Sequence, residues 1–363
     1  MQDFWKGRRV FITGHTGFKG AWLAFWLSEL GADVTGYALA PETEPNLYTL
    51  LDLQQRVNSI IDDIRDEAKL ASALAAAQPD IVFHLAAQPL VRKSYREPVS
   101  TFQTNVMGSI HLLEACRQCD SVKSIVVVTS DKCYENQEWA WGYRESEKLG
   151  GHDPYSASKA CTELLAQSWR LSFFNEANKD SLQACNLATV RAGNVIGGGD
   201  WSEDRLIPDI LRALGEGEDV DIRNPHAIRP WQHVLEPLAG YLLLAEKLFA
   251  QDGEQWAQAW NFGPADEDAR PVSWIVENLT SQWPTPASWK MMEGDHPHEA
   301  HYLKLDCSLA RDRLGWKPAW NLEQCLQHIV SWQSRFLAGD DMQAASIDLL
   351  NHYMRESRLF EVS

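Results

Sequence analysis

The sequence lacks a long apolar run. No segment approaches the roughly 20 consecutive apolar residues that a membrane-spanning helix needs. The first residues, MQDFWKGRRVFITG, also show no succession of positive region, apolar stretch and cleavage site. We therefore expect a cytoplasmic protein that has no membrane partner.

Positive charge is scarce as well. The chain has 33 lysines and arginines against 50 aspartates and glutamates, which gives a formal net charge of −17. Such a charge disfavours long-range attraction to nucleic acid or to an anionic membrane surface, so we expect neither as a partner. An anionic substrate would have to be bound by local positive groups against this field.

Cysteines and histidines lack the spacing of a metal site. The seven cysteines are scattered, and their number is odd, so we expect no disulfides. Cys116 and Cys119 spell C-x-x-C, but no second pair lies at zinc-ribbon spacing. The histidines of HPHEAHY at 296–302 have no firm ligand spacing either. We expect no bound metal.

Short apolar strands alternate with helical segments along the first half of the chain. The predicted strands are 8–13, 33–39, 57–61, 80–85, 124–130 and 182–191, and the predicted helices include 67–77, 98–117, 153–177 and, later, 236–249. Continuous apolar strands that alternate with helices require a parallel sheet covered on both faces. The sequence therefore predicts an α/β fold with a doubly wound parallel sheet.

A glycine-rich turn joins the first strand to the following helix. Gly14, Gly17 and Gly20 have G-x-x-G-x-x-G spacing in the context that dinucleotide binding requires. Small residues there let the backbone approach a pyrophosphate, and the helix start supplies N–H groups. Asp63, just after the third strand, could accept from an adenine amino group, or it could simply cap the next helix.

The end of the second strand carries no acid for the ribose hydroxyls. Residues 38–41 read Ala-Leu-Ala-Pro, and no arginine stands there to select a 2′-phosphate. The pattern favours NAD over NADP as the cofactor.

Regular alternation weakens beyond residue 190, where segments rich in Gly, Pro and Trp appear. Because 363 residues exceed the usual size of one core, we expect either one large α/β unit with additions or two closely joined domains. We predict an NAD-binding Rossmann domain over 1–190, which segments near 225–262 rejoin. A smaller, irregular α/β substrate domain would occupy mainly 191–340, and 341–363 would form a C-terminal tail.

Five residues form the candidate catalytic group. Tyr155 and Lys159 are spaced Y-x-x-x-K near the start of a helix, which puts both side chains on one face. A phenol is a weak base at neutral pH unless a neighbouring ammonium favours the phenolate. Ser130 ends the fifth strand and Asp131 and Lys132 follow at once, at the edge where ligands bind in such sheets, although Ser-Asp-Lys also suits a plain turn.

Seven landmarks in order resemble the extended short-chain dehydrogenase/reductase family, which contains NAD-dependent epimerases and dehydratases. They are GHTGFKG at 14–20, DDIRD at 62–66, HLAAQ at 84–88, NVMG at 105–108, VVVTSDKCY at 126–134, YSASK at 155–159 and RAGNVIGGG at 191–199. The resemblance implies that Tyr155 is the base, Lys159 its activator and ribose partner, and Ser130 a hydrogen-bond donor to the sugar oxygen. It extends the expected cofactor contacts to five further residues: Phe18, Ile64, Leu85, Ala86 and Ala87.

The residues after Ser130 indicate a subclass. Epimerases and reductases of the family usually have small residues there, whereas 4,6-dehydratases carry proton carriers, most often Asp-Glu. This chain has Asp131 and Lys132, and its 129–159 stretch is similar to that of dehydratases acting on CDP-D-glucose. The resemblance implies conversion of CDP-D-glucose to CDP-4-keto-6-deoxy-D-glucose, toward dideoxy sugars of surface polysaccharide (lipopolysaccharide O-antigen). A 4-epimerase, a reductase, a non-catalytic cofactor sensor, and a dTDP, UDP or GDP sugar substrate stay open.

The resemblance also suggests substrate contacts and an assembly. Asn194 and Arg229 match family residues at the substrate diphosphate, and we place Arg205 with them. The helices near 98–117 and 153–177 could pair with those of a second copy in a four-helix bundle, which implies a homodimer. The substitution of Asp-Lys for Asp-Glu leaves the identity of the C5 base open, because a lysine must lose its proton before it can act as a base.

Overall fold

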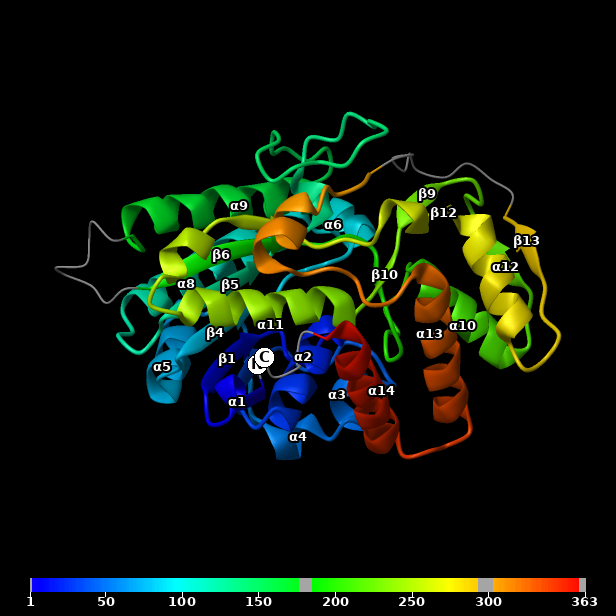
Figure 1. Ribbon diagram of the computed structural model, residues 1–363, viewed down its shortest axis with the longest axis horizontal. Helices are drawn as coiled ribbons and strands as arrows, with labels where there is room; N and C mark the ends of the chain where they lie inside the picture. The colour runs from blue at the N-terminus through cyan, green and yellow to red at the C-terminus, as the bar shows by residue number, and fades with distance from the viewer. Residues whose placement is uncertain (1, 176–184, 293–302, 359–363) are drawn as a thin grey trace.

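A parallel sheet of seven strands forms the centre of the molecule, in the order β11-β6-β5-β4-β1-β2-β3 (Figure 1). The computed structural model describes residues 2–175, 185–292 and 303–358. The strands are β1 (Arg9–Thr13), β2 (Asp33–Ala38), β3 (Asn58–Ile61), β4 (Ile81–His84), β5 (Ser124–Val128), β6 (Asn186–Arg191) and β11 (Ala259–Asn261). This confirms the predicted doubly wound α/β fold.

Helices cover both faces of the sheet because its strands are apolar on both sides. In β5, SIVVV, all five residues are buried. One face packs against α2 (Phe18–Glu29), α11 (Leu235–Phe249) and α14 (Met342–Ser357), which share a core cluster that includes the four-residue α1 (Gln2–Trp5). The other face packs against α5 (Glu67–Ala77), α8 (Gly108–Arg117) and α9 (Pro154–Ser172). Figure 1 shows these two layers on opposite sides of the strands.

Several predicted boundaries differ from those observed. The helix expected to reach residue 177 ends at Ser172, where Phe173 leaves the helical conformation. The helix expected over 98–117 is interrupted: α7 (Pro98–Phe102) and α8 are joined by a π-helical turn, Gln103–Met107. The strand expected to reach residue 130 ends at Val128, since Ser130 begins a 3-10 turn and its hydroxyl accepts from Lys132 N.

A smaller group of elements lies at one end of the molecule (Figure 1). It contains α10 (Leu206–Glu216), α12 (Val272–Gln282) and three two-stranded sheets: β7 (Val195–Ile196) with β10 (Gln232–His233), β8 (Val220–Ile222) with β13 (Trp289–Met291), and β9 (Ile228–Pro230) with β12 (Ala269–Pro271). A separate apolar cluster joins α10, α12, β8 and the start of α13 (Leu322–Leu337).

The C-terminal segment, the cysteines and the apolar helices can now be compared with the predictions. Met342–Ser357 form α14, whose Tyr353 is fully buried in the main core. All seven cysteines are free. In the ranges that the structure describes, no helix is both long enough and apolar enough to cross a membrane.

Candidate functional site

A cavity of about 2300 Å³ lies along the carboxyl ends of the parallel strands. Such an edge is where open α/β sheets bind ligands. The structure brings all the predicted site residues to this one cavity: Gly14, Gly17, Phe18, Gly20, Asp63, Ile64, Leu85, Ala86, Ala87, Ser130, Asp131, Lys132, Tyr155, Lys159, Asn194, Arg205 and Arg229.

The glycine turn is built for close backbone approach. Gly14 has a positive φ of 82°, and a Cβ there would lie 2.7 Å from Ala86 N. A Cβ on Gly20 would lie 2.0 Å from Gly14 O. Gly17 is the N-cap of α2, and no side chain caps the helix. The free N–H groups of the first turn and the absence of side chains suit a pyrophosphate.

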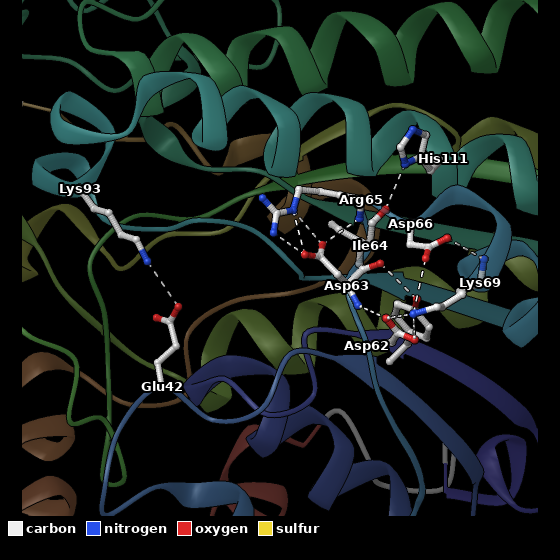
Figure 2. Close-up of polar contacts among 10 residues, drawn as sticks. Glu42, Asp62, Asp63, Ile64, Arg65, Asp66, Lys69, Lys93 and His111 are labelled. Atoms are coloured by element: carbon white, nitrogen blue, oxygen red, sulfur yellow. Dashed lines mark hydrogen bonds and ion pairs between the residues drawn. The ribbon is translucent and has the colours of Figure 1, made fainter.

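Asp63 lines the cavity, and Arg65 already binds its carboxylate (Figure 2). Arg65 Nε donates to Asp63 Oδ2 at 2.9 Å, and these hydrogen bonds hold the pKa of the carboxyl below its ordinary value. Asp62 pairs with Lys69, and His111 Nδ1 donates to Ile64 O at 3.1 Å. The segment is therefore fixed at the place where an adenosine could bind.

Glu42 is an acid that the sequence analysis missed. It follows the Ala-Leu-Ala-Pro stretch after β2, lines the cavity, and its Oε1 lies 3.5 Å from Lys93 Nζ of α6 (Val91–Arg96) (Figure 2). Glu42 stands one residue beyond the 38–41 stretch in which an acid for the ribose was expected. Its carboxylate places negative charge near the end of β2.

Asp131 is held inside a short turn. Ser130 Oγ donates to Asp131 Oδ1 at 2.9 Å and accepts from Lys132 N at 3.2 Å. Burial raises the pKa of Asp131 above its ordinary value, while the charge of Lys132 opposes the shift. Lys132 itself is exposed at the cavity. The turn thus pairs a buried carboxyl with an accessible amine.

Tyr155 and Lys159 lie one turn apart near the start of α9, which Asp153 caps through Ser156 N. Burial raises the pKa of Tyr155 to about 12, while the Ser130 hydroxyl and the charge of Arg205 oppose the shift. Burial lowers the pKa of Lys159 to about 8, and its Nζ donates to Val128 O at 3.1 Å. Both groups are buried at the cavity wall.

Lys19 is a cavity cation that the sequence analysis did not single out. It lies between Gly17 and Gly20, and burial, followed by the charges of Arg205 and Lys159, lowers its pKa to about 7. The sequence could have indicated this residue, because a lysine between the glycines of a predicted cofactor-binding turn lies at the site. With a pKa of about 7, its amine is only partly protonated near neutral pH at the place where cofactor and substrate would meet.

The predicted substrate residues line the part of the cavity formed by the smaller group of elements. Asn194 has a positive φ of 33°. Arg205 Nη1 lies 3.2 Å from Asp200 Oδ2, and Arg229 Nη1 donates to Ile228 O at 3.0 Å. Sequence reasoning missed Asp204, whose Oδ1 pairs with Arg92 at 2.9 Å and with Arg223 at 3.2 Å. Arg205 and Arg229 can bind an anionic substrate despite the net negative charge of the chain.

No group of three or more His, Cys, Asp or Glu residues suited to a metal ion occurs within 2–175, 185–292 and 303–358. The HPHEAHY histidines at 296–302 lie outside the described residues.

Comparisons with known proteins show which family the chain resembles. A family model described as GDP-mannose 4,6 dehydratase matches residues 11–329. A CDP-glucose 4,6-dehydratase from Salmonella typhimurium is 54% identical over 353 residues, covering 97% of this chain and 98% of that protein. A dTDP-glucose 4,6-dehydratase from Xanthomonas campestris is 26% identical, covering 88% of this chain and 92% of that protein.

Solved structures share the fold. A UDP-glucose 4-epimerase from Stenotrophomonas maltophila with bound NAD has a TM-score of 0.77 at 20% identity, covering 92% of this chain and 99% of its own. A dTDP-glucose 4,6-dehydratase double mutant from Streptomyces venezuelae, also with NAD, has a TM-score of 0.75 at 20% identity over the same shares. At this identity the likeness concerns the fold.

Proposed function

This chain belongs to the GDP-mannose 4,6-dehydratase family of NAD-dependent sugar-nucleotide epimerases and dehydratases, and from that premise we propose that it dehydrates CDP-glucose to CDP-4-keto-6-deoxy-D-glucose as a hydro-lyase. The observation that carries the proposal is the 54% identity to a CDP-glucose 4,6-dehydratase over 97% of the chain. Dehydratases of dTDP-glucose are 25–26% identical to it.

The cofactor of the proposed reaction is NAD. The pyrophosphate would lie against the backbone of Gly14, Gly17 and Phe18, where no side chain blocks the N-terminus of α2. Residues 38–41 at the end of β2 support NAD over NADP, because no arginine stands there to bind a 2′-phosphate. Bound NAD would accept a hydride from C4 of the sugar and return it to C6.

Residues of this chain would handle the protons. Tyr155 takes the proton of the C4 hydroxyl, with Ser130 hydrogen-bonding the same oxygen and the charge of Lys159 favouring the phenolate. The C4 ketone makes the C5 proton acidic. Lys132 removes that proton, and Asp131, whose pKa burial raises, protonates the C6 hydroxyl, which leaves as water. A proton returns to C5 when the hydride reaches C6, so the net change is loss of one water.

The substrate diphosphate would lie between Arg205 and Arg229, with Asn194 as a hydrogen-bonding partner. Guanidinium groups suit phosphate oxygens because they donate two parallel hydrogen bonds. We divide the chain accordingly into an NAD-binding domain over 1–190, rejoined by 225–262, a substrate domain mainly over 191–340, and a C-terminal segment over 341–363. We also propose that the protein acts in the cytoplasm.

A homodimer through a four-helix bundle is proposed from the surface of α7, α8 and α9. Large apolar side chains lie exposed at Val99 of α7, at Met107 of the π-helical turn before α8, and at Leu164 and Leu171 of α9. Burying them against a second copy would remove apolar area from water. Light scattering should give twice the monomer mass, and a monomer would overturn this assembly.

Mass spectrometry tests the activity. Purified protein incubated with NAD and CDP-glucose should give a product lighter by one water. A product of unchanged mass would indicate an epimerase, and a gain of two hydrogens a reductase. Parallel reactions with the dTDP, UDP and GDP sugars test the base, and CDP-glucose should react fastest.

A further inference from the structure

We propose that Tyr134 is a positioning residue for the elimination half of the reaction, because it ties the turn carrying Asp131 and Lys132 to the buried ion pair Glu163–Arg191. The inference rests on the proposed function. Tyr134 borders the cavity, but it is 1% exposed and its hydroxyl is bonded to Arg191 and Asn261, so its proposed action is through these neighbours.

The ion pair is a fixed point beneath the site. Glu163 and Arg191 are each 3% exposed, and Arg191 Nε and Nη2 donate to the two carboxylate oxygens at 2.9 and 2.8 Å. Thr189 Oγ1 donates to Oε2 at 2.7 Å, and Thr129 Oγ1 donates to Oε1. The pair therefore joins α9, β6 and Thr129, which directly follows β5, with both carboxylate oxygens satisfied, which makes the arrangement rigid.

The Tyr134 hydroxyl is bound on both sides. It accepts from Arg191 Nη1 at 2.7 Å and donates to Asn261 Oδ1 at 2.8 Å. Asn261 is itself fixed, since its Nδ2 donates to Tyr143 O at 2.8 Å and to Asp306 O at 3.1 Å. Moving the Tyr134 ring would break hydrogen bonds to a buried charge, and such bonds cost more to lose than neutral ones.

A backbone hydrogen bond connects Tyr134 to the turn that contains Asp131 and Lys132, the proposed proton carriers. Tyr134 N donates to Asp131 O at 3.4 Å and closes the 3-10 turn that contains Lys132. The other end of the turn is held separately, because Thr129 N donates to Val190 O at 2.9 Å. Loss of the Tyr134 hydroxyl should thus disturb Asp131 and Lys132 while Ser130 keeps its anchor at the end of β5.

The test is the Tyr134→Phe variant, measured on both halves of the reaction. The rate of water loss should fall roughly ten- to a hundredfold, since small misplacements of reacting groups have costs of this order. The rate of C4 oxidation, followed by NADH absorbance in a single turnover, should stay at the wild-type level. NADH should therefore accumulate. Asn261→Ser, which removes the acceptor of the Tyr134 hydroxyl, should shift the ratio of the two rates in the same direction.

Tyr353→Phe is the matched control. It also removes a fully buried hydroxyl bonded to a carboxylate, Glu236 Oε2 at 2.8 Å, but it lies in α14 outside the cavity lining. It should lower thermal stability and leave the ratio of the two rates unchanged. Equal slowing of both halves in Tyr134→Phe, or no slowing, overturns the positioning role alone. A wild-type protein that releases no water from CDP-glucose overturns the proposed function.

Discussion

Asp131 and Gly193 are in such close contact that a Cβ added to Gly193 would lie 2.1 Å from Asp131 Oδ2. The glycine backbone forms one wall of the carboxyl site, and the Ser130 hydroxyl binds the other carboxyl oxygen. The position of the proposed acid thus depends on a residue 62 positions away that bears no side chain.

Gly193→Ala should displace Asp131. Its methyl group cannot fit unless the carboxyl moves, so the rate of water loss should fall by about tenfold or more. Oxidation at C4 should continue, and single-turnover NADH absorbance would show it. Gly215→Ala is the control, because the nearest atom to its added Cβ would be 3.7 Å away at the Leu337 side chain. Normal water loss in Gly193→Ala would mean that the Asp131 carboxyl needs no fixed position.

Lys132→Ala tests the proposed C5 base. The C4 ketone forms before the C5 proton is removed, so the variant should accumulate NADH and exchange the C5 proton with heavy water more slowly than wild type. A general base typically contributes about 10²–10⁴ to the rate. Exchange at the wild-type rate would show that another group is the base and that Lys132 instead orients Asp131 or the substrate.

Tyr155→Phe should abolish the NADH signal itself. Without the phenol, no group takes the C4 hydroxyl proton, and the expected loss in the oxidation rate is again about 10²–10⁴. The change removes one oxygen from a buried ring, so nucleotide binding measured by thermal shift should persist. An NADH burst equal to that of wild type would remove Tyr155 from the role of base.

Glu236 predicts a pH dependence of stability that is unrelated to catalysis. It is fully buried, accepts from Ala319 N, Trp320 N and the Tyr353 hydroxyl, and burial raises its pKa to about 7 from an ordinary 4.5. The folded state therefore binds this proton more tightly than the unfolded state. Its contribution is fully present below pH 4.5 and is lost as the pH rises through about 7.

Urea unfolding of wild type and Glu236→Gln at pH 5 and pH 8 measures this contribution. Between the two pH values, wild type should lose up to about 3 kcal/mol relative to the variant, because each unit of pKa shift corresponds to about 1.4 kcal/mol. A difference in unfolding free energy that does not change with pH would contradict the raised pKa.

The sheet and the cavity-lining residues were predictable because their signals are local. Apolar strands such as SIVVV and the glycine turn at Gly14–Gly20 each fall within a few consecutive residues, and parallel strands bring their carboxyl ends to one edge. Tyr155, Lys159 and the residues after β5 were predicted to lie at this edge because they follow strands of the same parallel sheet.

The supporting network was not predictable in this way. Tyr134, Glu163, Arg191 and Asn261 come from four separate elements, and only the tertiary fold gives each polar group its partner. The ends of helices could not be predicted either. The residues beyond Ser172 still fit a helical pattern, and no proline or glycine there indicates that the helix ends. Glu42 was missed because it stands one residue beyond the stretch at the end of β2 in which the acid was expected.

A deuterium label at C4 of CDP-glucose tests the central claim most directly. The account predicts that the isolated protein with NAD releases one water and yields a CDP-4-keto-6-deoxy sugar with the deuterium at C6, because the hydride removed from C4 is the one returned. A product of unchanged mass, or a dehydrated product whose label has passed into solvent, would contradict it.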